Sequence, residues 1–456
     1  MKRKGLSASQ IVVLGFLAGI AIGTAVLMLP ISQARPAGID GFFPAIFTTV
    51  SALCVTGLST VDVEHFWTPF GHFTIMALIQ VGGLGIMTVA SLIGLVITDR
   101  MSLKARLNTS AESQSVVLAD FRNLLLRVFR LVVIIEASAA TLLAIRFATE
   151  YGYDPGKAIW YGVFHAISAF NNAGFALFSD SLMGFVSDPW IQLVIDAEII
   201  LGGMGFPVMM ELLRRVRAKR GGPAHVRAGL PYHWSLHAKL VVITSLVLLI
   251  GGWIYFASLE WFNPATLGNL SLGDKLLNSF TASVMPRTAG FNSLDISQMH
   301  PASWLGMDLL MFIGAGPAGT SGGIKVTTVA VLIFIVWTEV RGEVAVNIGN
   351  RRLPRSLQRQ ALTIISLASA TVVSAIIFLH LITDFTTDQI AFEVFSAFGT
   401  VGLTTGITAS LSQPAQVVIM LLMFAGRVGT VLIASSLAMR VTKKHFELPT
   451  ERPLIG

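Results

Sequence analysis

Eight apolar stretches dominate the sequence, and each is long enough to cross a lipid bilayer. A helix of about 20 apolar residues spans a bilayer core about 30 Å thick. Only 12% of the residues are charged, about half the share of an average soluble domain, and the mean hydropathy is +0.72. We therefore expect an all-helical integral membrane protein. The stretches cover residues 11–30, 72–98, 124–149, 189–213, 237–258, 303–338, 360–382 and 415–440.

The first stretch is also compatible with a cleavable signal peptide. Basic residues precede it, and small residues follow it near 32–34. Its apolar run of about 20 residues exceeds the roughly 7–15 residues of a signal sequence. We therefore expect a structural helix instead.

The charges between the stretches predict the orientation of the chain. Basic residues gather at the N-terminus, in the connections near 99–123, 214–239 and 341–359, and in the C-terminal tail, whereas the alternate connections are mostly acidic. Basic loops favour the cytoplasmic side of a membrane. We expect a protein of the plasma membrane with both termini in the cytoplasm. The same rule accounts for the net charge of +7, so no nucleic-acid partner is expected.

Little in the sequence favours an enzyme. The single cysteine, Cys54, excludes an intrachain disulfide and a multi-cysteine metal site. The nine histidines lack metal-ligand spacing such as H-E-x-x-H, and no nucleophile and base stand in a recognisable arrangement. We expect no enzymatic activity, no transition-metal site and no cofactor bound by this chain.

A short motif ending in glycine recurs four times. The glycines lie at intervals of 117, 116 and 112 residues, which is typical of duplicated structural units. Each motif follows a moderately apolar segment that is too short to cross the membrane. A single segment of this kind is open to interpretation as a surface helix, but four in matching places favour re-entrant half-helices. The segments lie near 41–53, 158–170, 272–284 and 388–398, and the glycines are Gly57, Gly174, Gly290 and Gly402.

These features divide the chain into four repeats of span, re-entrant segment and span. Two crossings return the chain to its starting side, so the repeats are parallel and are expected to surround a central pore. The first repeat includes a cytoplasmic linker, and the last includes a cytoplasmic tail. The predicted boundaries are 1–123, 124–236, 237–359 and 360–456.

The motifs are expected to line this pore. Irregular backbone is tolerated inside a bilayer only where it is buried or borders a water-filled cavity. Backbone carbonyls that point at the axis would replace the water shell of a cation, and glycine permits the close approach. Glycines near 82–85 and 202–205 are better explained by close helix packing. The predicted filter residues are Val55, Thr56, Gly57, Asn172, Ala173, Gly174, Thr288, Ala289, Gly290, Thr400, Val401 and Gly402.

The sixth stretch is too long for one helix. Residues 303–338 would extend about 54 Å as a helix, and a glycine-rich run with one proline interrupts them. This run contains G-x-G-x-x-G, but a dinucleotide site requires a preceding strand. We expect a flexible loop at membrane depth, below the filter. Its residues include Gly314, Gly316, Gly319, Thr320, Ser321, Gly322 and Gly323.

Lys325 and Arg427 are the cationic residues expected deepest in apolar surroundings. Such charges cost about 2.5–3.5 kcal/mol at the centre of a membrane helix. Lys325 is equally compatible with a side chain that extends toward the cytoplasm. For Arg427 we hypothesise hydrogen bonds to carbonyls of the glycine-rich loop and a positive barrier beneath the filter.

Several acidic residues also fall within apolar segments. Glu136, Asp196 and Glu198 are expected to face protein or a partner subunit rather than lipid. Glu393 lies in the fourth re-entrant segment. It would either orient the filter, favour a cation nearby, or accept hydrogen bonds from backbone amides.

The four motifs resemble those of the Trk/Ktr/HKT superfamily of potassium transporters, and the chain is most similar to the Ktr-type membrane subunits. Residues 165–175, 287–295 and 395–403 carry the resemblance. It implies potassium uptake, an intramembrane gate formed by the 314–323 loop, and a homodimer with one pore in each protomer. It also implies a cytoplasmic ring of nucleotide-binding regulatory subunits.

The resemblance leaves several alternatives open. Plant relatives that favour sodium carry serine at the first filter glycine, so Gly57 favours potassium, whereas Cys54 departs from the usual threonine. Passive and sodium-linked uptake both fit, with sodium as the activator in the second case. The basic loops at 214–227 and 341–359 would contact either the regulatory ring or anionic lipid. The alternative functions are a sodium-preferring or unselective cation pathway and a non-transporting scaffold or receptor.

Overall fold

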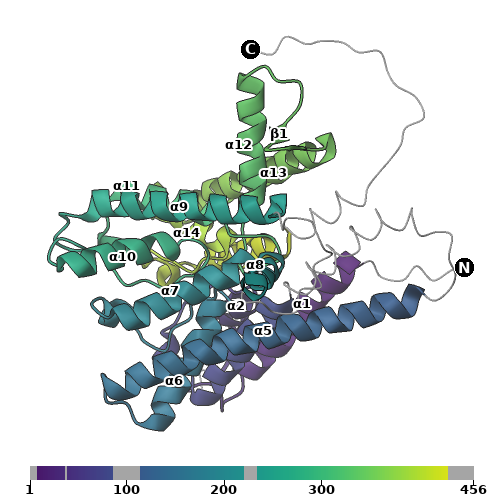
Figure 1. Cartoon of the computed structure of the whole chain (residues 1–456). Coiled ribbons are helices and arrows are strands. Elements are labelled where there is room, and N and C mark those ends of the chain that lie inside the picture. The colour runs from purple at the N-terminus through teal and green to yellow at the C-terminus, as the bar shows by residue number, and fades with distance from the viewer. Residues whose placement is uncertain (1–7, 36–37, 86–112, 220–233, 430–456) are drawn as a thin grey trace, which may run out of the picture.

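The computed structural model describes residues 8–35, 38–85, 113–219 and 234–429, and these are mostly helical (Figure 1). Within these ranges, four helices are individually long and apolar enough to cross a membrane. They correspond to the first, third, fifth and seventh predicted stretches. They are α1 (Ala8–Leu27), α5 (Ser113–Thr149), α9 (Leu236–Glu260) and α13 (Arg355–Ile382).

A shorter helix follows each of these four. In three of them a polar side chain, Asp154, Ser271 or Thr386, accepts a hydrogen bond from the first turn. Such caps pair backbone N–H groups that have no partner within the helix. Each short helix ends a few residues before one of the four motif glycines. These helices are α2 (Phe42–Leu53), α6 (Pro155–Phe170), α10 (Leu272–Val284) and α14 (Thr387–Gly399).

A third set of helices leads away from the motifs. Residues 69–85 form the first of them, and the other three carry proline in the first turn, where its missing N–H costs no hydrogen bond. The second and eighth predicted stretches continue outside the described residues. The other helices are α7 (Pro189–Met204), α11 (Pro301–Phe312) and α15 (Gln413–Phe424), which passes into a π-helical turn at Ala425–Gly429.

The fourth predicted stretch, 189–213, is apolar enough to cross a membrane but is sharply bent. α8 (Phe206–Lys219) leaves α7 at an angle of 107°. Gly205 makes the turn with a φ of 85°, a left-handed conformation that costs other residues about 1–2 kcal/mol. A Cβ at Gly205 would also overlap the carbonyl oxygen of Pro317. The bend therefore depends on a tertiary contact that hydropathy does not reveal.

The sixth predicted stretch is interrupted at the glycine-rich run. α11 ends at Phe312, and α12 (Val326–Val340) begins after Lys325. The connection that follows α12 forms a two-stranded hairpin, which an all-helical fold lacks. Both α12 and this hairpin project from the other helices (Figure 1). The strands are β1 (Asn347–Ile348) and β2 (Arg351–Arg352).

The remaining described elements are short helices. They are α3 (Val63–Phe66), η1 (Gly38–Gly41), η2 (Met183–Phe185), η3 (Ile296–Gln298) and η4 (Thr408–Ser410).

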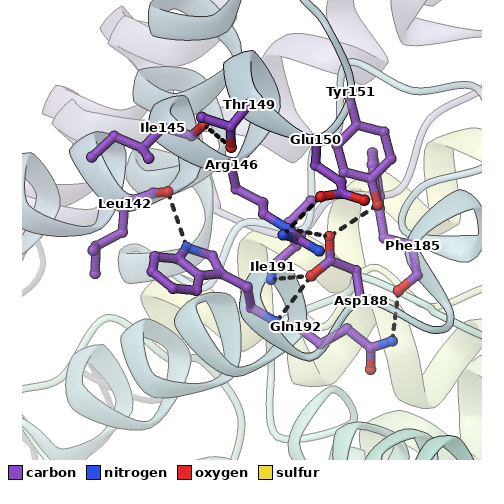
Figure 2. A network of polar contacts seen from close by, with 11 residues as sticks. Leu142, Ile145, Arg146, Thr149, Glu150, Tyr151, Phe185, Asp188, Ile191 and Gln192 are labelled. Atoms are coloured by element: carbon purple, nitrogen blue, oxygen red, sulfur yellow. Dashed lines mark hydrogen bonds and ion pairs between the residues drawn. The ribbon is translucent and has the colours of Figure 1, made fainter.

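Polar contacts join α5 to α7 at one end of both helices (Figure 2). Arg146 Nε donates to Asp188 Oδ2 at 2.9 Å, and the Tyr151 hydroxyl donates to the same oxygen at 3.0 Å. The other oxygen of Asp188 accepts from the backbone N–H groups of Trp190 and Ile191. One buried carboxylate therefore both caps α7 and links it to α5.

Glycines let the third set of helices approach the short helices closely. In three places, a Cβ on a helix glycine would overlap a carbonyl oxygen at the C-terminal end of a short helix. Small residues serve this purpose in many membrane proteins. The close approach holds the first, second and fourth glycine motifs against a neighbouring helix. The pairs are Gly82 with Leu53 of α2, Gly202 with Phe170 of α6, and Gly426 with Phe398 of α14.

Gly202→Ala is expected to lower the melting temperature of the full-length protein in detergent, because the added methyl group forces α6 and α7 apart at a cost of about 1–3 kcal/mol. Gly251→Ala is the matched control, since Gly251 lies in α9 with nothing within 4 Å of its Cβ position. That change should leave the melting temperature unchanged or raise it. Equal melting temperatures for the two variants would contradict this account of the packing.

Candidate functional site

The four motif glycines contact one another in a closed ring, termed here the glycine ring. Their φ values are 95°, 70°, 74° and 99° in chain order, a region that glycine enters without penalty. A Cβ placed on each would lie 2.8–3.1 Å from the Cα of the next, which is too close for any side chain. The contacts run from Gly57 to Gly174, to Gly290, to Gly402 and back to Gly57.

The backbone alternates in handedness at each motif. The residue two positions before each glycine also has a positive φ, between 52° and 73°, whereas the residue between them has an ordinary negative φ. Alternation of this kind turns successive carbonyl groups toward one side of the chain. Left-handed backbone costs a residue with a side chain about 1–3 kcal/mol, and such strain clusters at functional sites. The residues are Val55, Asn172, Thr288 and Thr400.

Serines within the motifs hold the backbone in this shape. In the first and fourth motifs, the glycine N–H donates to Ser51 Oγ at 3.0 Å and to Ser396 Oγ at 3.1 Å. In the second motif, Ser168 Oγ donates to the Phe175 carbonyl at 2.8 Å. The sequence pattern contains these serines, but their bracing role depends on contacts six or seven residues away along the chain.

Several buried polar atoms of the motifs have no hydrogen-bond partner within the described part of the chain. They are the hydroxyls of Thr56, Thr288 and Thr400 and the amide nitrogen of Asn172, in side chains at most 1% exposed. Buried polar groups are normally paired, because an unpaired one costs about 1–3 kcal/mol. The free hydroxyls are therefore available to a ligand, such as an ion or its water.

The glycine-rich loop 314–323 packs against the second and fourth motifs. Thr320 Oγ1 lies 2.8 Å from Asn172 Oδ1 and 3.1 Å from the Phe170 carbonyl. A Cβ at Gly322 would overlap the hydroxyl of Thr400. The other predicted residues contact the loop itself or α7. Gly314 lies against the Gly322 carbonyl, and Ser321 Oγ accepts from Ala315 N. Gly316 and Gly319 lie against carbonyls of α7, and Gly323 has a φ of 62°.

Two cationic side chains bind this loop. Arg427 is 1% exposed and donates to the carbonyls of Thr320 and, at 3.2 Å, Gly82. These include the loop hydrogen bond hypothesised from the sequence. Lys325 Nζ donates to the Ser321 carbonyl at 2.5 Å, so its ammonium group is turned onto the loop instead of extending away from it.

A third buried cation, Arg287, is absent from the sequence prediction. Its side chain is 7% exposed, whereas Lys325 is only partly buried, so Lys325 and Arg427 are not the two most buried cations. Arg287 Nη2 donates to the Ser245 hydroxyl at 2.8 Å. The sequence feature that could have suggested its burial is its position directly before Thr288 of the third motif.

Buried carboxylates lie behind the motifs and face protein, as expected for intramembrane acids. Glu393 is 1% exposed and accepts from the hydroxyls of Thr404 and, at 2.8 Å, Thr408. Both partners follow the fourth glycine, so Glu393 orients the segment beyond it. Asp196 accepts from the Thr281 hydroxyl at 2.9 Å.

Polar side chains also tie together the segments that follow the first two motifs, on the side of the ring expected to face outward. Ser179 Oγ donates to Asp62 Oδ2 at 2.6 Å, and Ser179 N donates to Glu64 Oε2 at 3.0 Å. His65 Nδ1 lies 2.9 Å from the same oxygen of Asp62. The hydrogen bond to Asp62, reinforced by the Asp62 charge, raises the pKa of His65 above its ordinary value of 6.5.

Sequence comparisons relate the whole chain to cation transporters. The family model described as TrkH, cation transport protein, matches residues 7–445. The chain is 40% identical to Ktr system potassium uptake protein B of Bacillus subtilis, over 94% of this chain and 92% of that protein. It is 37% identical to the protein of the same name from Vibrio alginolyticus, over 100% and 96%. It is 34% identical to potassium/sodium uptake protein NtpJ of Enterococcus hirae, over 100% and 98%.

A solved structure shares the fold. The potassium transporter TrkH of Vibrio parahaemolyticus matches with a TM-score of 0.72 and 18% sequence identity, over 95% of this chain and 86% of that one. At this level of identity the match bears on architecture and not on the ion.

His65 is expected to titrate above pH 6.5, because Asp62 stabilises its protonated form. The contribution of this pair to folding is therefore fully present below pH 6.5 and is lost as the pH rises through the raised pKa. Histidine NMR titration of the full-length protein, with His65→Gln to assign the signal, measures the value. In Asp62→Asn the pKa of His65 should fall back toward 6.5. An unchanged pKa of His65 in this variant would refute the role of Asp62.

Proposed function

Because the chain belongs to the TrkH family of cation transport proteins, we propose that it takes up potassium ions across the plasma membrane through the glycine ring. The observation that carries the proposal is the ring itself, where four left-handed backbone segments approach one another. Two of the relatives are named potassium uptake proteins, and a third is named a potassium/sodium uptake protein.

Four parallel repeats would surround this ring. In each repeat a long helix, a short helix, a glycine motif and a further helix follow one another. We assign the long and the further helices as eight membrane spans and the short helices as four re-entrant pore helices. Two crossings in each repeat then leave both termini in the cytoplasm, in agreement with the basic loops.

Selectivity would come from the backbone carbonyls of the ring motifs. Carbonyls turned toward one axis replace the hydration shell of an entering ion, and buried threonine hydroxyls supply further oxygens. Sodium-favouring plant relatives carry serine at the position of Gly57. The glycine at this position therefore favours potassium. A sodium-preferring or unselective pathway is the alternative within this mechanism.

The 314–323 loop is the proposed gate. It packs against two motifs, and Arg427 and Lys325 bind its carbonyls. Their positive charges would oppose a cation that leaves the ring. Opening requires the loop to give up these contacts, and a hydrogen bond to a charged group is worth about 1.5–3 kcal/mol.

A cytoplasmic partner is proposed to control this gate. Two relatives are named as components of a Ktr system, which fits a membrane subunit that works with other proteins. We propose a homodimer, with one pore in each protomer, docked on a ring of nucleotide-binding regulatory subunits and activated by sodium. Exposed Arg351 and Arg352 of the β1–β2 hairpin offer a basic surface to that ring or to anionic lipid.

A non-transporting scaffold or receptor is the alternative from another class. A scaffold or receptor function does not explain why the backbone is strained at four equivalent positions. Ion conduction does explain this strain. Flux through the purified protein separates the two.

Rubidium-86 uptake into proteoliposomes that hold a potassium gradient tests the pore. Wild-type protein should take up rubidium in competition with external potassium, with and without sodium as separate conditions. Gly290→Asp should abolish uptake, because any Cβ at this position overlaps the Val401 carbonyl. Gly251→Ala, away from the ring, should retain it. A folded wild-type protein that conducts nothing, even with its regulatory subunit added, would falsify the proposal.

Arg427→Ala should raise the rubidium leak measured without the regulatory subunit, because the loop loses its charged hydrogen bonds. The loss of about 1.5–3 kcal/mol shifts the balance between closed and open forms by about tenfold or more. Arg427→Lys keeps the charge but not both hydrogen bonds, and it should give an intermediate leak. A leak in Arg427→Ala equal to that of the wild type would remove Arg427 from the gate.

A further inference from the structure

A cluster of oxygen-bearing side chains lies beside the second motif, outside the glycine ring. Glu136 of α5, which is 7% exposed, accepts from Gln80 Nε2 at 3.0 Å and from Asn171 Nδ2 at 3.1 Å. Asn171 Nδ2 also lies 2.7 Å from Gln80 Oε1. The helix at 69–85, α5 and the end of α6 therefore meet through three polar side chains.

Glu198 of α7 brings a second carboxylate to this region. Its side chain is 2% exposed, and neither of its oxygens has a hydrogen-bond partner within the described ranges. It lies one helical turn before Gly202, on the face of α7 that packs against the end of α6. α7 also packs against α5, the helix that carries Glu136.

The cluster holds more oxygen acceptors than N–H donors. Asn171 Oδ1 is buried and has no partner in the described part of the chain, in addition to both oxygens of Glu198. No lysine or arginine of the described residues forms an ion pair with Glu136 or Glu198. A buried carboxylate without a counter-charge is strongly unfavourable, so each of these carboxyl groups needs either a proton or a bound cation.

We infer that Glu136, Glu198 and Asn171 form a binding site for a dehydrated alkali cation among α5, α6 and α7. A donor set made only of oxygen suits hard cations. A monovalent ion would balance the single charge of Glu198, which accepts no hydrogen bond in the described part of the chain, while amide hydrogen bonds stabilise Glu136. Ionisable residues inside a membrane protein commonly mark ion sites of this kind.

An ion at this site would connect to the ring through the backbone. Asn171 directly precedes Asn172, the left-handed residue of the second motif. Occupancy would therefore brace the end of α6 and the shape of the adjoining motif. The site lies outside the ring, so it stands on its own contacts and does not require that the ring conduct potassium.

Thermal unfolding of the full-length protein in detergent, titrated with sodium chloride against N-methyl-D-glucamine chloride at constant ionic strength, tests the site. Sodium should raise the melting temperature of the wild type, and Glu198→Gln should weaken the apparent affinity by about tenfold or more. Asp196→Asn is the matched control, since Asp196 is equally buried on the same helix but bonds to Thr281 instead. It should respond to sodium as the wild type does.

Two results would overturn the inference. The first is a wild type that sodium does not stabilise beyond N-methyl-D-glucamine, which would indicate carboxyl groups neutralised by protons. The second is a sodium response of undiminished affinity in Glu198→Gln, which would assign the binding to the ring. If Glu198→Gln does not fold, Glu136→Gln and the infrared carboxylate bands of the wild type on exchange of sodium decide the matter. Unchanged affinity in Glu136→Gln, or carboxylate bands that do not move, would equally rule the site out.

Discussion

The mutual contact of four glycines is the constraint on which the rest of the structure depends. Backbone can approach backbone this closely only where no Cβ intervenes and where φ is positive. Inside a bilayer such irregular segments also need every neighbour to shield them from lipid. Each motif follows the end of a short helix, which places it in the ring. Glycines such as Gly202 allow the adjoining helices to pack closely against the ends of those short helices. The strain at positions such as Val55 and Thr288 persists because this packing over-determines it.

The charged groups near the ring also depend on this packing. Arg427 is almost fully buried, yet it is stabilised by the carbonyl oxygens of Thr320, in the broken sixth stretch, and of Gly82, in the helix at 69–85. Hydrogen bonds to main-chain oxygens of the 314–323 loop thus offset part of the free-energy cost of burying these cations. The cations in turn hold the loop against the motifs. Glu393 performs a comparable task on the other side, where it fixes the segment beyond the fourth glycine. In this way the elements proposed for selectivity and for gating share hydrogen bonds.

Local sequence predicts those parts of the fold that depend on length and composition. The long apolar helices α5 and α9 and the break before α12 lie where hydropathy and glycine content placed them. The bend at Gly205 was missed because it depends on contact with the distant Pro317 carbonyl, and the burial of Arg287 because its partner Ser245 is 42 residues away. Sequence spacing identified the four ring glycines, and three of the motifs contain a serine, but the spacing did not reveal that these serines brace the backbone. The repeat boundaries and the functions assigned to the motif residues stay predictions.

The most direct test of the central claim is to locate an ion in the ring. Crystals of the full-length protein grown with rubidium in place of potassium can be measured at the rubidium absorption edge. The account predicts anomalous density on the axis enclosed by Gly57, Gly174, Gly290 and Gly402, within reach of the motif carbonyls. Well-ordered motifs without anomalous density there would contradict it, whatever the flux measurements give.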